Sequence, residues 1–281
     1  MGTEVFVPEL PEVETVVREI RPHLVGRRFA AVRVGSLPLR KAWSPDWVPL
    51  LLNARIQEVR RRGKWILLHL AGGKNLVIHL GMSGQLTVVP TGEPVRLHTH
   101  IVLDLDRGNK QLRFRDIRRF GSATVFADRG LLDQFFSDSQ LGPEPFELKA
   151  RYWRECLHKT GRCLKAVLLD QRVVAGVGNI YADEALFAGC LHPARLGRDI
   201  TGAEAERLRK AVVKVLKYAI TRRGSSIRNY VGGSGLKGEY QEEFSVYGRT
   251  GEPCLRCRRP IERIRLAGRS THFCPRCQPA V

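Results

Sequence analysis

The sequence predicts an α+β fold with a strand-rich first half, a helical second half and a small cysteine-rich module at the carboxyl end. Residues 24–130 divide into short apolar runs separated by tight turns, which is typical of strands. From about Lys149 onward, apolar residues recur at helical spacing. Residues 252–281 contain four paired cysteines. The length of 281 residues is enough for about two domains.

A helix is expected to begin near Pro11. Proline suits the first helical position, and the carboxylates of Glu12 and Glu14 favour the positive end of a helix. Apolar residues then follow at helical spacing and form one stripe for a core, namely Val13, Val16, Val17 and Ile20.

Two hairpins are predicted in the strand-rich half. In the first, the runs 64–70 and 75–89 flank Ala71-Gly72-Gly73. In the second, the runs 101–105 and 111–115 flank Asp106-Arg107-Gly108-Asn109. Several short strands in succession favour an antiparallel β-sandwich.

The second half is predicted to be helical. A Gly-Pro-Glu-Pro sequence at 142–145 is the expected linker between the two halves. Beyond it, four segments have helical apolar spacing: 151–158, 162–170, 179–188 and 203–222.

Two glycines precede the third of these helices. Gly176 and Gly178 permit a tight turn, so a helix that begins at Asn179 would present free backbone N–H groups to an anion. A dinucleotide-binding loop is the alternative. It is excluded because the third glycine is missing and the segment follows a helix rather than a strand.

The four carboxyl-terminal cysteines predict one structural Zn²⁺. Cys254-x2-Cys257 and Cys274-x2-Cys277 have the spacing of two knuckles that each donate two thiolates to a tetrahedral ion. Four thiolates leave no open coordination position for water, so a metallohydrolase is not expected. Two disulfides are the alternative. The remaining cysteines, Cys156, Cys163 and Cys190, are expected to be small core residues.

The charge balance predicts a nucleic-acid partner. Lysine and arginine total 47 against 28 acidic residues, which gives a net charge of +19 and an isoelectric point near 10.2. Residues 252–281 alone hold seven arginines and two glutamates. No apolar run approaches the length of a membrane span and no secretory leader is present, so a cytoplasmic protein is expected.

The segment from Pro8 to Thr15, PELPEVET, resembles the amino terminus of the formamidopyrimidine-DNA glycosylases, bacterial repair enzymes that excise oxidised purines. The resemblance extends to about Gln278. It implies a catalytic β-sandwich domain over 8–141, a helix–two-turns–helix DNA-binding domain over 142–240 and a zinc-finger β-hairpin over 241–281. It also implies a monomer that binds duplex DNA containing oxidised purines or abasic sites, at the bacterial nucleoid.

The same resemblance implies the catalytic residues. Pro8 corresponds to the nucleophile, Glu9 to a carboxylate that relays protons, and Lys64 to a lysine that contacts the phosphate beside the lesion. The expected reaction is release of 8-oxoguanine or a formamidopyrimidine through an iminium on the proline nitrogen, followed by β,δ-elimination. Glu12 corresponds to a further acidic position, although a helix-dipole role explains it equally well.

Residues that contact DNA are implied in the same way. Met82, Arg118 and Phe120 correspond to side chains that fill the void left by an extruded base, because a base cannot be attacked at its sugar inside the stack. The implied phosphate contacts are His98, His100, Lys165, Asn179 and Arg269. His98 and His100 are equally explained as ordinary strand histidines, and Glu184 is expected to support the two-turn element.

One departure from the family pattern concerns the nucleophile, because Pro8 is residue eight of this chain. A proline nitrogen inside a peptide bond is an amide and cannot attack. Valine is encoded by GTG, which can initiate translation in bacteria. Residues 1–7 are therefore expected to be absent from the mature protein: translation starts at position 7, residues 1–6 are a mis-assigned upstream extension, and removal of the initiator methionine exposes Pro8. A genuine disordered arm is the alternative, and it would leave a non-catalytic zinc-containing binder of damaged DNA.

An endonuclease VIII-like pyrimidine glycosylase also stays open, although the Leu-Pro-Glu-Val-Glu-Thr continuation and a Gly/Ser-containing loop over 224–240 favour the purine enzyme.

Overall fold

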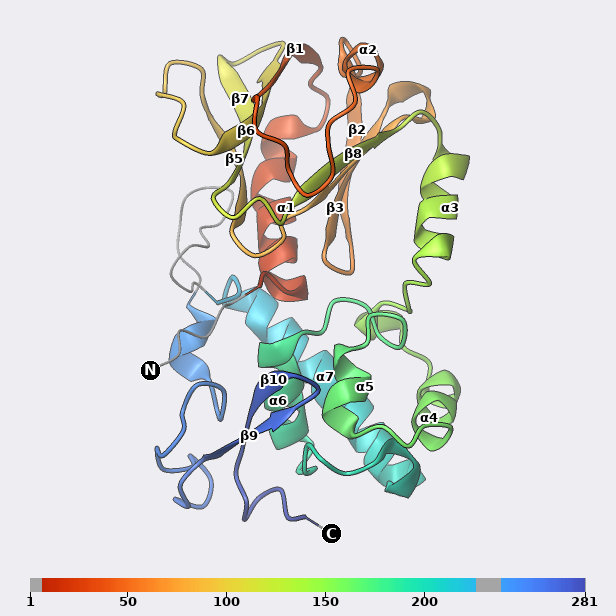
Figure 1. Ribbon diagram of the computed structural model, residues 1–281, viewed down its shortest axis with the longest axis vertical. Helices are drawn as coiled ribbons and strands as arrows, with labels where there is room; N and C mark the ends of the chain where they lie inside the picture. Colours follow the sequence, from red (N-terminus) through yellow and green to blue (C-terminus); the bar gives the residue numbers. More distant parts are fainter. Residues whose placement is uncertain (1–6, 226–238, 281) are drawn as a thin grey trace. The chain divides into compact units, whose positions relative to one another are not determined.

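The computed structural model describes residues 7–225 and 239–280. These residues form two compact units (Figure 1). Among the described residues, the first unit comprises 7–139, 223–225 and 239, and the second comprises 140–222 and 240–280.

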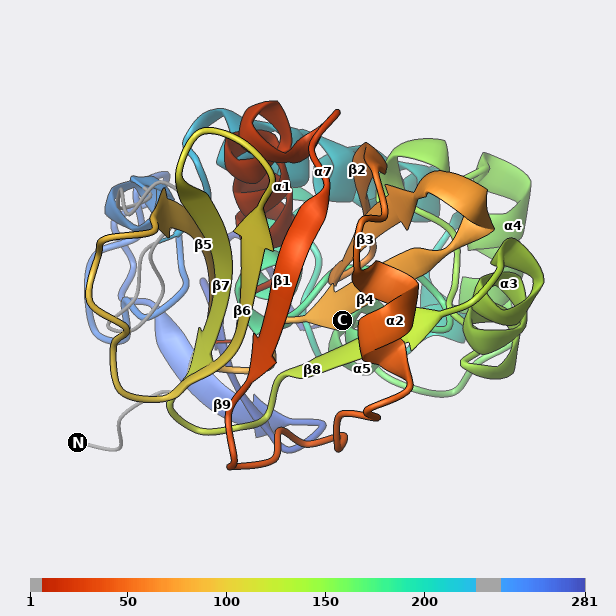
Figure 2. The same ribbon diagram turned by 90° about the horizontal axis from the view of Figure 1, so that it is seen from above.

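The first unit contains two antiparallel sheets of four strands each (Figure 2). One sheet has the order β1-β6-β7-β5, formed by Phe29–Val34, Thr99–Leu105, Lys110–Asp116 and Gly84–Pro90. The other has the order β2-β3-β4-β8, formed by Ile56–Arg62, Trp65–Leu70, Asn75–His79 and Ser122–Phe126. The short helix α2 (Trp47–Leu51) and a 3-10 turn (Ala71–Gly73) lie between strands.

Both sheets share one apolar core with helix α1 (Leu10–Leu24). The predicted stripe Val13, Val16, Val17 and Ile20 is fully buried in this core. The sandwich and the α+β class are therefore confirmed. The helix begins one residue earlier than predicted, which puts Pro11 at the second helical position, where its missing N–H is equally harmless.

The run 75–89 is not one strand but two. It leaves the second sheet at His79, turns through Leu80–Ser83 and enters the first sheet at Gly84. A Cβ at Gly84 would lie 2.2 Å from the Leu80 carbonyl oxygen, so the turn is too tight for a side chain there. Gly81, Ser83 and Gly84 are turn residues within the run, and they mark the change of sheet.

Helix α3 (Arg129–Asp138) was not predicted either. Asp128 caps it by accepting a hydrogen bond from the Leu131 N–H at 2.9 Å. Leu132 and Phe136 of this helix pack against Leu67 and Val77, on the face of the second sheet away from the core.

The second unit has four helices and a two-stranded hairpin within its described residues. The helices are α4 (Ala150–His158), α5 (Leu164–Leu169), α6 (Asn179–Ala188) and α7 (Gly202–Thr221), which confirms the four predicted segments to within two residues at each helix end. The hairpin pairs β9 (Glu262–Leu266) with β10 (Arg269–Phe273). Short 3-10 helices span Pro145–Glu147, Gly197–Asp199 and Tyr240–Glu243.

The three cysteines outside the knuckles are not core residues. Cys156 and Cys163 are half-buried, and Cys190 is exposed. The Cys190 sulfur lies 3.2 Å from an Arg256 guanidinium nitrogen. No helix within the described ranges combines the length and the apolar composition needed to cross a membrane.

Candidate functional site

The start of α1 carries the first two predicted catalytic residues. Pro8 is buried just ahead of the helix, and Glu9, 2% exposed, is the residue that caps it. The Glu9 backbone N–H donates to the Glu12 carboxylate at 2.9 Å. Residues 1–6, on which the expectation of an over-extended start rests, lie outside the described residues.

Glu12 has a structural task. Its second carboxylate oxygen accepts hydrogen bonds from the Ser225 backbone N–H at 2.8 Å and from the Ser225 hydroxyl at 3.0 Å. Gly224, which directly precedes Ser225, has a φ of +71°, and a Cβ there would lie 2.7 Å from a carboxylate oxygen of Glu12. Glu12 therefore joins the start of α1 to residues 224–225. Most of the predicted loop over 224–240 lies outside the described residues.

Lys64 lies in the turn between β2 and β3, where Gly63 has a positive φ. His79, the last residue of the neighbouring strand β4, pairs with Trp65 of β3. Burial lowers the pKa of His79 to about 4, and the positive charges of Lys64 and Arg40 contribute to that lowering. The imidazole is therefore neutral at pH 7, and its Nδ1 accepts a hydrogen bond from the Gly81 N–H at 3.0 Å.

His79 belongs to the same neighbourhood as Lys64 and was not predicted from the sequence. The signal was available, because His79 stands at the end of a strand immediately before the turn that contains Met82. A single strand-end histidine does not stand out without the fold.

Met82, Arg118 and Phe120 come from two turns that touch. Met82 lies in the turn between β4 and β5, and the other two lie between β7 and β8. A Cβ on Gly81 would lie 2.4 Å from the Gly121 nitrogen, so the two backbones are in direct contact. Phe120 is 45% exposed, and the Arg118 guanidinium lies 5.0 Å from the centre of its ring.

The two candidate histidines differ in their surroundings. His98 is half-buried and has a left-handed backbone with φ 67°. His100 is buried, and its ring nitrogens lie 3.2 Å from the Leu37 carbonyl oxygen and 2.9 Å from the Asp116 carbonyl oxygen. Because both nitrogens face backbone carbonyls, this arrangement favours the strand-histidine alternative, and the phosphate contact of His100 stays a prediction.

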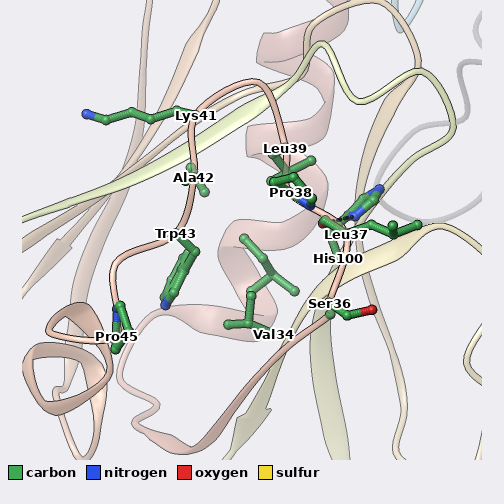
Figure 3. Close-up of a pocket in the computed structure, with 13 residues that line it drawn as sticks. Val34, Ser36, Leu37, Pro38, Leu39, Lys41, Ala42, Trp43, Pro45 and His100 are labelled. Atoms are coloured by element: carbon green, nitrogen blue, oxygen red, sulfur yellow. Dashed lines mark hydrogen bonds between the residues drawn. The ribbon is translucent and has the colours of Figure 1, made fainter.

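A cavity of about 310 Å³ lies beside His100, lined mainly by residues 34–45 (Figure 3). Figure 3 shows the His100 ring next to Leu37 at one side of this cavity, with Trp43 across from it. Its described lining includes His100 but not Lys64, Met82 or Phe120. The candidate site is therefore a group of turns rather than this cavity.

Lys165 in the second unit is completely buried, at 0% exposure. Its ammonium donates to the Asp183 carboxylate at 2.5 Å and to the Asn179 carbonyl at 2.9 Å. The other Asp183 oxygen accepts from the His272 backbone N–H at 2.8 Å. In this arrangement a buried ion pair joins α5 to α6 and to β10 and does not present Lys165 to a phosphate, so the direct phosphate contact stays a prediction.

Asn179 and Arg269 lie where the two-turn element meets the hairpin. The Asn179 amide donates to the Ser270 carbonyl at 3.0 Å, and its Oδ1 is buried without a hydrogen-bond partner among the described residues. Arg269 is exposed at the first position of β10, next to the tight turn that contains Ala267 and Gly268.

Glu184 supports this element from within the core. Its carboxylate accepts hydrogen bonds from three consecutive backbone N–H groups, those of Ser245, Val246 and Tyr247, at 2.9 to 3.1 Å. Burial raises the pKa of Glu184, and the three N–H groups oppose that rise. Glu184 thus connects α6 to the segment that leads into the cysteine module.

The four cysteine sulfurs fit one tetrahedral zinc ion. The Sγ atoms of Cys254, Cys257, Cys274 and Cys277 all lie within 4.8 Å of one another. Cys254 and Cys277 are 3.9 Å apart, and Cys257 and Cys274 are 3.4 Å apart. Four sulfurs at about 2.3 Å from zinc would be separated by about 3.8 Å. Backbone N–H groups of Arg256 and Cys277 point at the sulfurs of Cys254 and Cys274, which favours thiolates.

Comparison with protein families finds three matches along the chain. The formamidopyrimidine-DNA glycosylase N-terminal domain matches residues 7–123, and the H2TH domain of the same enzymes matches residues 141–231. A zinc finger found in FPG and IleRS matches residues 251–280.

Similar proteins cover almost the whole chain. Formamidopyrimidine-DNA glycosylase of Desulforamulus reducens is 41% identical over 98% of this chain and 100% of its own length. The protein of that name from Chloroflexus aurantiacus is 44% identical, covering 97% of this chain and 98% of its own. Lactococcus lactis Fpg in complex with abasic-site DNA has a TM-score of 0.89 at 34% identity, covering 97% of this chain and 100% of that one. The same enzyme in complex with DNA that contains Fapy-dG gives 0.88 at 33% identity, with the same coverage.

Proposed function

Because the chain belongs to the formamidopyrimidine-DNA glycosylase family, we propose that it excises oxidised purines from duplex DNA and then cleaves the strand at the abasic site. The substrates are 8-oxoguanine and formamidopyrimidines. The chain acts through a catalytic sandwich over 8–141, whose compact unit also includes residues 223–225, a helix–two-turns–helix domain over 142–240 and a zinc finger over 241–281. It acts as a monomer at the nucleoid in the bacterial cytoplasm.

The observation that carries this proposal is the convergence of Met82, Arg118 and Phe120. Two turns that each cross from one sheet to the other meet at Gly81 and Gly121 and present an apolar ring beside a guanidinium. A thioether and an aromatic ring can replace lost stacking, and a guanidinium can face an orphaned base. This combination supports an enzyme that removes a base from the stack.

Base removal begins at Pro8. The secondary amine, once freed from the peptide bond, attacks C1′ of the extruded nucleotide as the C1′–base bond breaks. The amine then loses its proton, the C1′–O4′ bond breaks with protonation of O4′, and the opened sugar is held as an iminium. The positive charge acidifies the C2′ protons, so β-elimination and then δ-elimination release the two phosphates. Glu9, held at the helix start, relays the protons. The net positive charge of +19 supports binding of the DNA backbone.

Lys64 of the first unit and Asn179 and Arg269 of the second contact phosphates, and His98 is a further candidate. The zinc ion holds the hairpin that carries Arg269. The direct test compares base release from duplexes that contain 8-oxoguanine or an oxidised pyrimidine. Faster release of 8-oxoguanine supports the proposal, whereas a preference for the pyrimidine would indicate the endonuclease VIII-like alternative.

The void-filling role predicts a split between binding and excision. Met82→Ala and Phe120→Ala remove contacts made only when the base is extruded, so each is expected to slow single-turnover excision about 10-fold or more. Binding to undamaged duplex should change less than about 3-fold, because phosphate contacts dominate it. Excision by both variants at the parent rate would show that these side chains do not fill the void.

The burial of Lys165 makes a prediction of a different kind. Lys165→Met leaves the Asp183 carboxylate buried without its cation, a loss of about 3–5 kcal/mol in stability for such pairs. The double variant Lys165→Met with Asp183→Asn removes both charges. The lower stability of the single variant should weaken its binding to DNA, and the double variant is expected to recover most of that lost affinity.

Salt dependence separates this arrangement from a phosphate contact. The slope of log Kd against log salt concentration should match the parent in both Lys165 variants, whereas Arg269→Ala, the exposed control, should lower it by about one. Lys165 would instead be a phosphate ligand if both Lys165 variants lowered the slope by about one and the double variant did not recover the DNA affinity.

A further inference from the structure

Asp116, at the end of β7, is 0% exposed and accepts hydrogen bonds from both of the touching turns. One carboxylate oxygen accepts from the Ser83 hydroxyl and from the Arg118 backbone N–H, the latter at 3.2 Å. The other oxygen accepts from the Gly121 backbone N–H at 2.7 Å. A buried carboxylate is costly unless several donors satisfy it, and here the donors are the turns themselves.

These donors flank the void-filling side chains closely. Ser83 directly follows Met82, while Arg118 and Gly121 enclose Phe120. The Ser83 hydroxyl also accepts from the Arg118 N–H at 3.0 Å, so the two turns are linked to each other as well as to Asp116. The Asp116 carboxylate therefore fixes the backbone beside all three side chains.

The main chain of Asp116 extends the link to a third segment. Its N–H donates to the His98 carbonyl at 3.0 Å, and its carbonyl faces a ring nitrogen of His100 at 2.9 Å. The start of β6 is thereby joined to the same residue. Asp116 is thus hydrogen-bonded to the segment that contains His98 and to both turns.

We propose that Asp116 is a positioning residue that holds Met82, Arg118 and Phe120 as one rigid wedge for insertion into the duplex. The proposal rests on the proposed function, since it concerns the same void-filling step. A wedge that is ordered before binding loses less conformational freedom on insertion. Asp116 acts through these three residues and does not touch the reacting atoms.

Asp116→Asn tests the proposal with little change in volume. The amide keeps one acceptor and replaces the other with an NH₂ group, which must then face the N–H of Gly121 or Arg118. The turns should loosen without a cavity in the core. Ser83→Ala removes a single donor and should give a weaker effect of the same kind. Asp104→Asn is the matched control, because Asp104 lies on neighbouring strand β6 and pairs with exposed Arg33.

Two substrates separate positioning from general damage. Single-turnover release of 8-oxoguanine from duplex DNA requires the wedge, whereas cleavage of a preformed abasic site in single-stranded DNA does not. Asp116→Asn is expected to slow the first about 10- to 100-fold and the second less than about 3-fold. The control Asp104→Asn should stay within about 2-fold of the parent on both.

Insertion itself can be observed with 2-aminopurine placed opposite a non-reactive abasic analogue. Binding of the parent protein should raise the fluorescence of the 2-aminopurine, because the wedge unstacks that base. Asp116→Asn should reduce this rise at saturating protein. Equal losses on both substrates, or an unchanged rise in fluorescence, would overturn the proposal. If Asp116→Asn does not fold, Ser83→Ala decides by the same measurements. If protein whose chain begins at Pro8 leaves 8-oxoguanine in place, that result would count against the proposed function, while the fluorescence still reports on the wedge.

Discussion

Protein whose chain begins at Pro8 should be trapped covalently on 8-oxoguanine duplex by borohydride, whereas protein that retains residues 1–7 should not be trapped. Only a free proline nitrogen has the lone pair needed to form an iminium, so the expected difference is all or none. Expression from methionine followed directly by Pro8, with removal of the methionine, gives the first form. Intact mass establishes which form is present in each sample.

The control for this experiment is Glu9→Gln in the form that begins at Pro8. It should still bind lesion DNA but lose base excision, because its proton relay is missing. Cleavage of preformed abasic sites needs no departing base and should suffer less. Trapping by protein whose mass includes residues 1–7 would refute Pro8 as the nucleophile and direct attention to a lysine.

Loss of zinc should have the second large effect. Structural zinc contributes about 10–16 kcal/mol to the folding of small modules, so Cys257→Ser should abolish both zinc binding and binding to abasic-analogue duplex. The first unit should stay folded, since its core contains none of these cysteines. Metal analysis, far-ultraviolet circular dichroism and a binding titration measure the three quantities.

Cys190→Ser is the matched control for the zinc experiment, because Cys190 is an exposed cysteine outside the four-sulfur cluster. It should keep one zinc per chain and the parent affinity for DNA. Active parent protein that contains no zinc would contradict the assignment of the four thiolates.

Features with a local cause could be predicted from the sequence. Helix α6 was placed at its observed bounds because two glycines end the preceding turn and apolar residues then recur at helical spacing. The zinc ligands were predicted from spacing alone, since two residues between cysteines suffice to form a knuckle.

Features that depend on distant partners could not be predicted. Lys165 stands in a short apolar helix, and only the fold shows that Asp183 and residues of β10 surround it. His100 is followed by apolar residues in a strand, and its ring partners Leu37 and Asp116 come from other segments. A titratable side chain on a predicted strand or helix can equally face solvent or a buried partner, and the local pattern does not distinguish them.

The contact between Glu12 and Ser225 also bears on how the polypeptide can be divided. Residues 223–225 follow α7 in the chain yet belong to the unit built around α1, so the chain passes between the units more than once. A fragment that ends near residue 141 would lack Ser225 and leave an oxygen of a buried carboxylate without two of its donors. The catalytic sandwich is therefore discontinuous in sequence, and a single cut at the Gly-Pro-Glu-Pro linker does not release it intact.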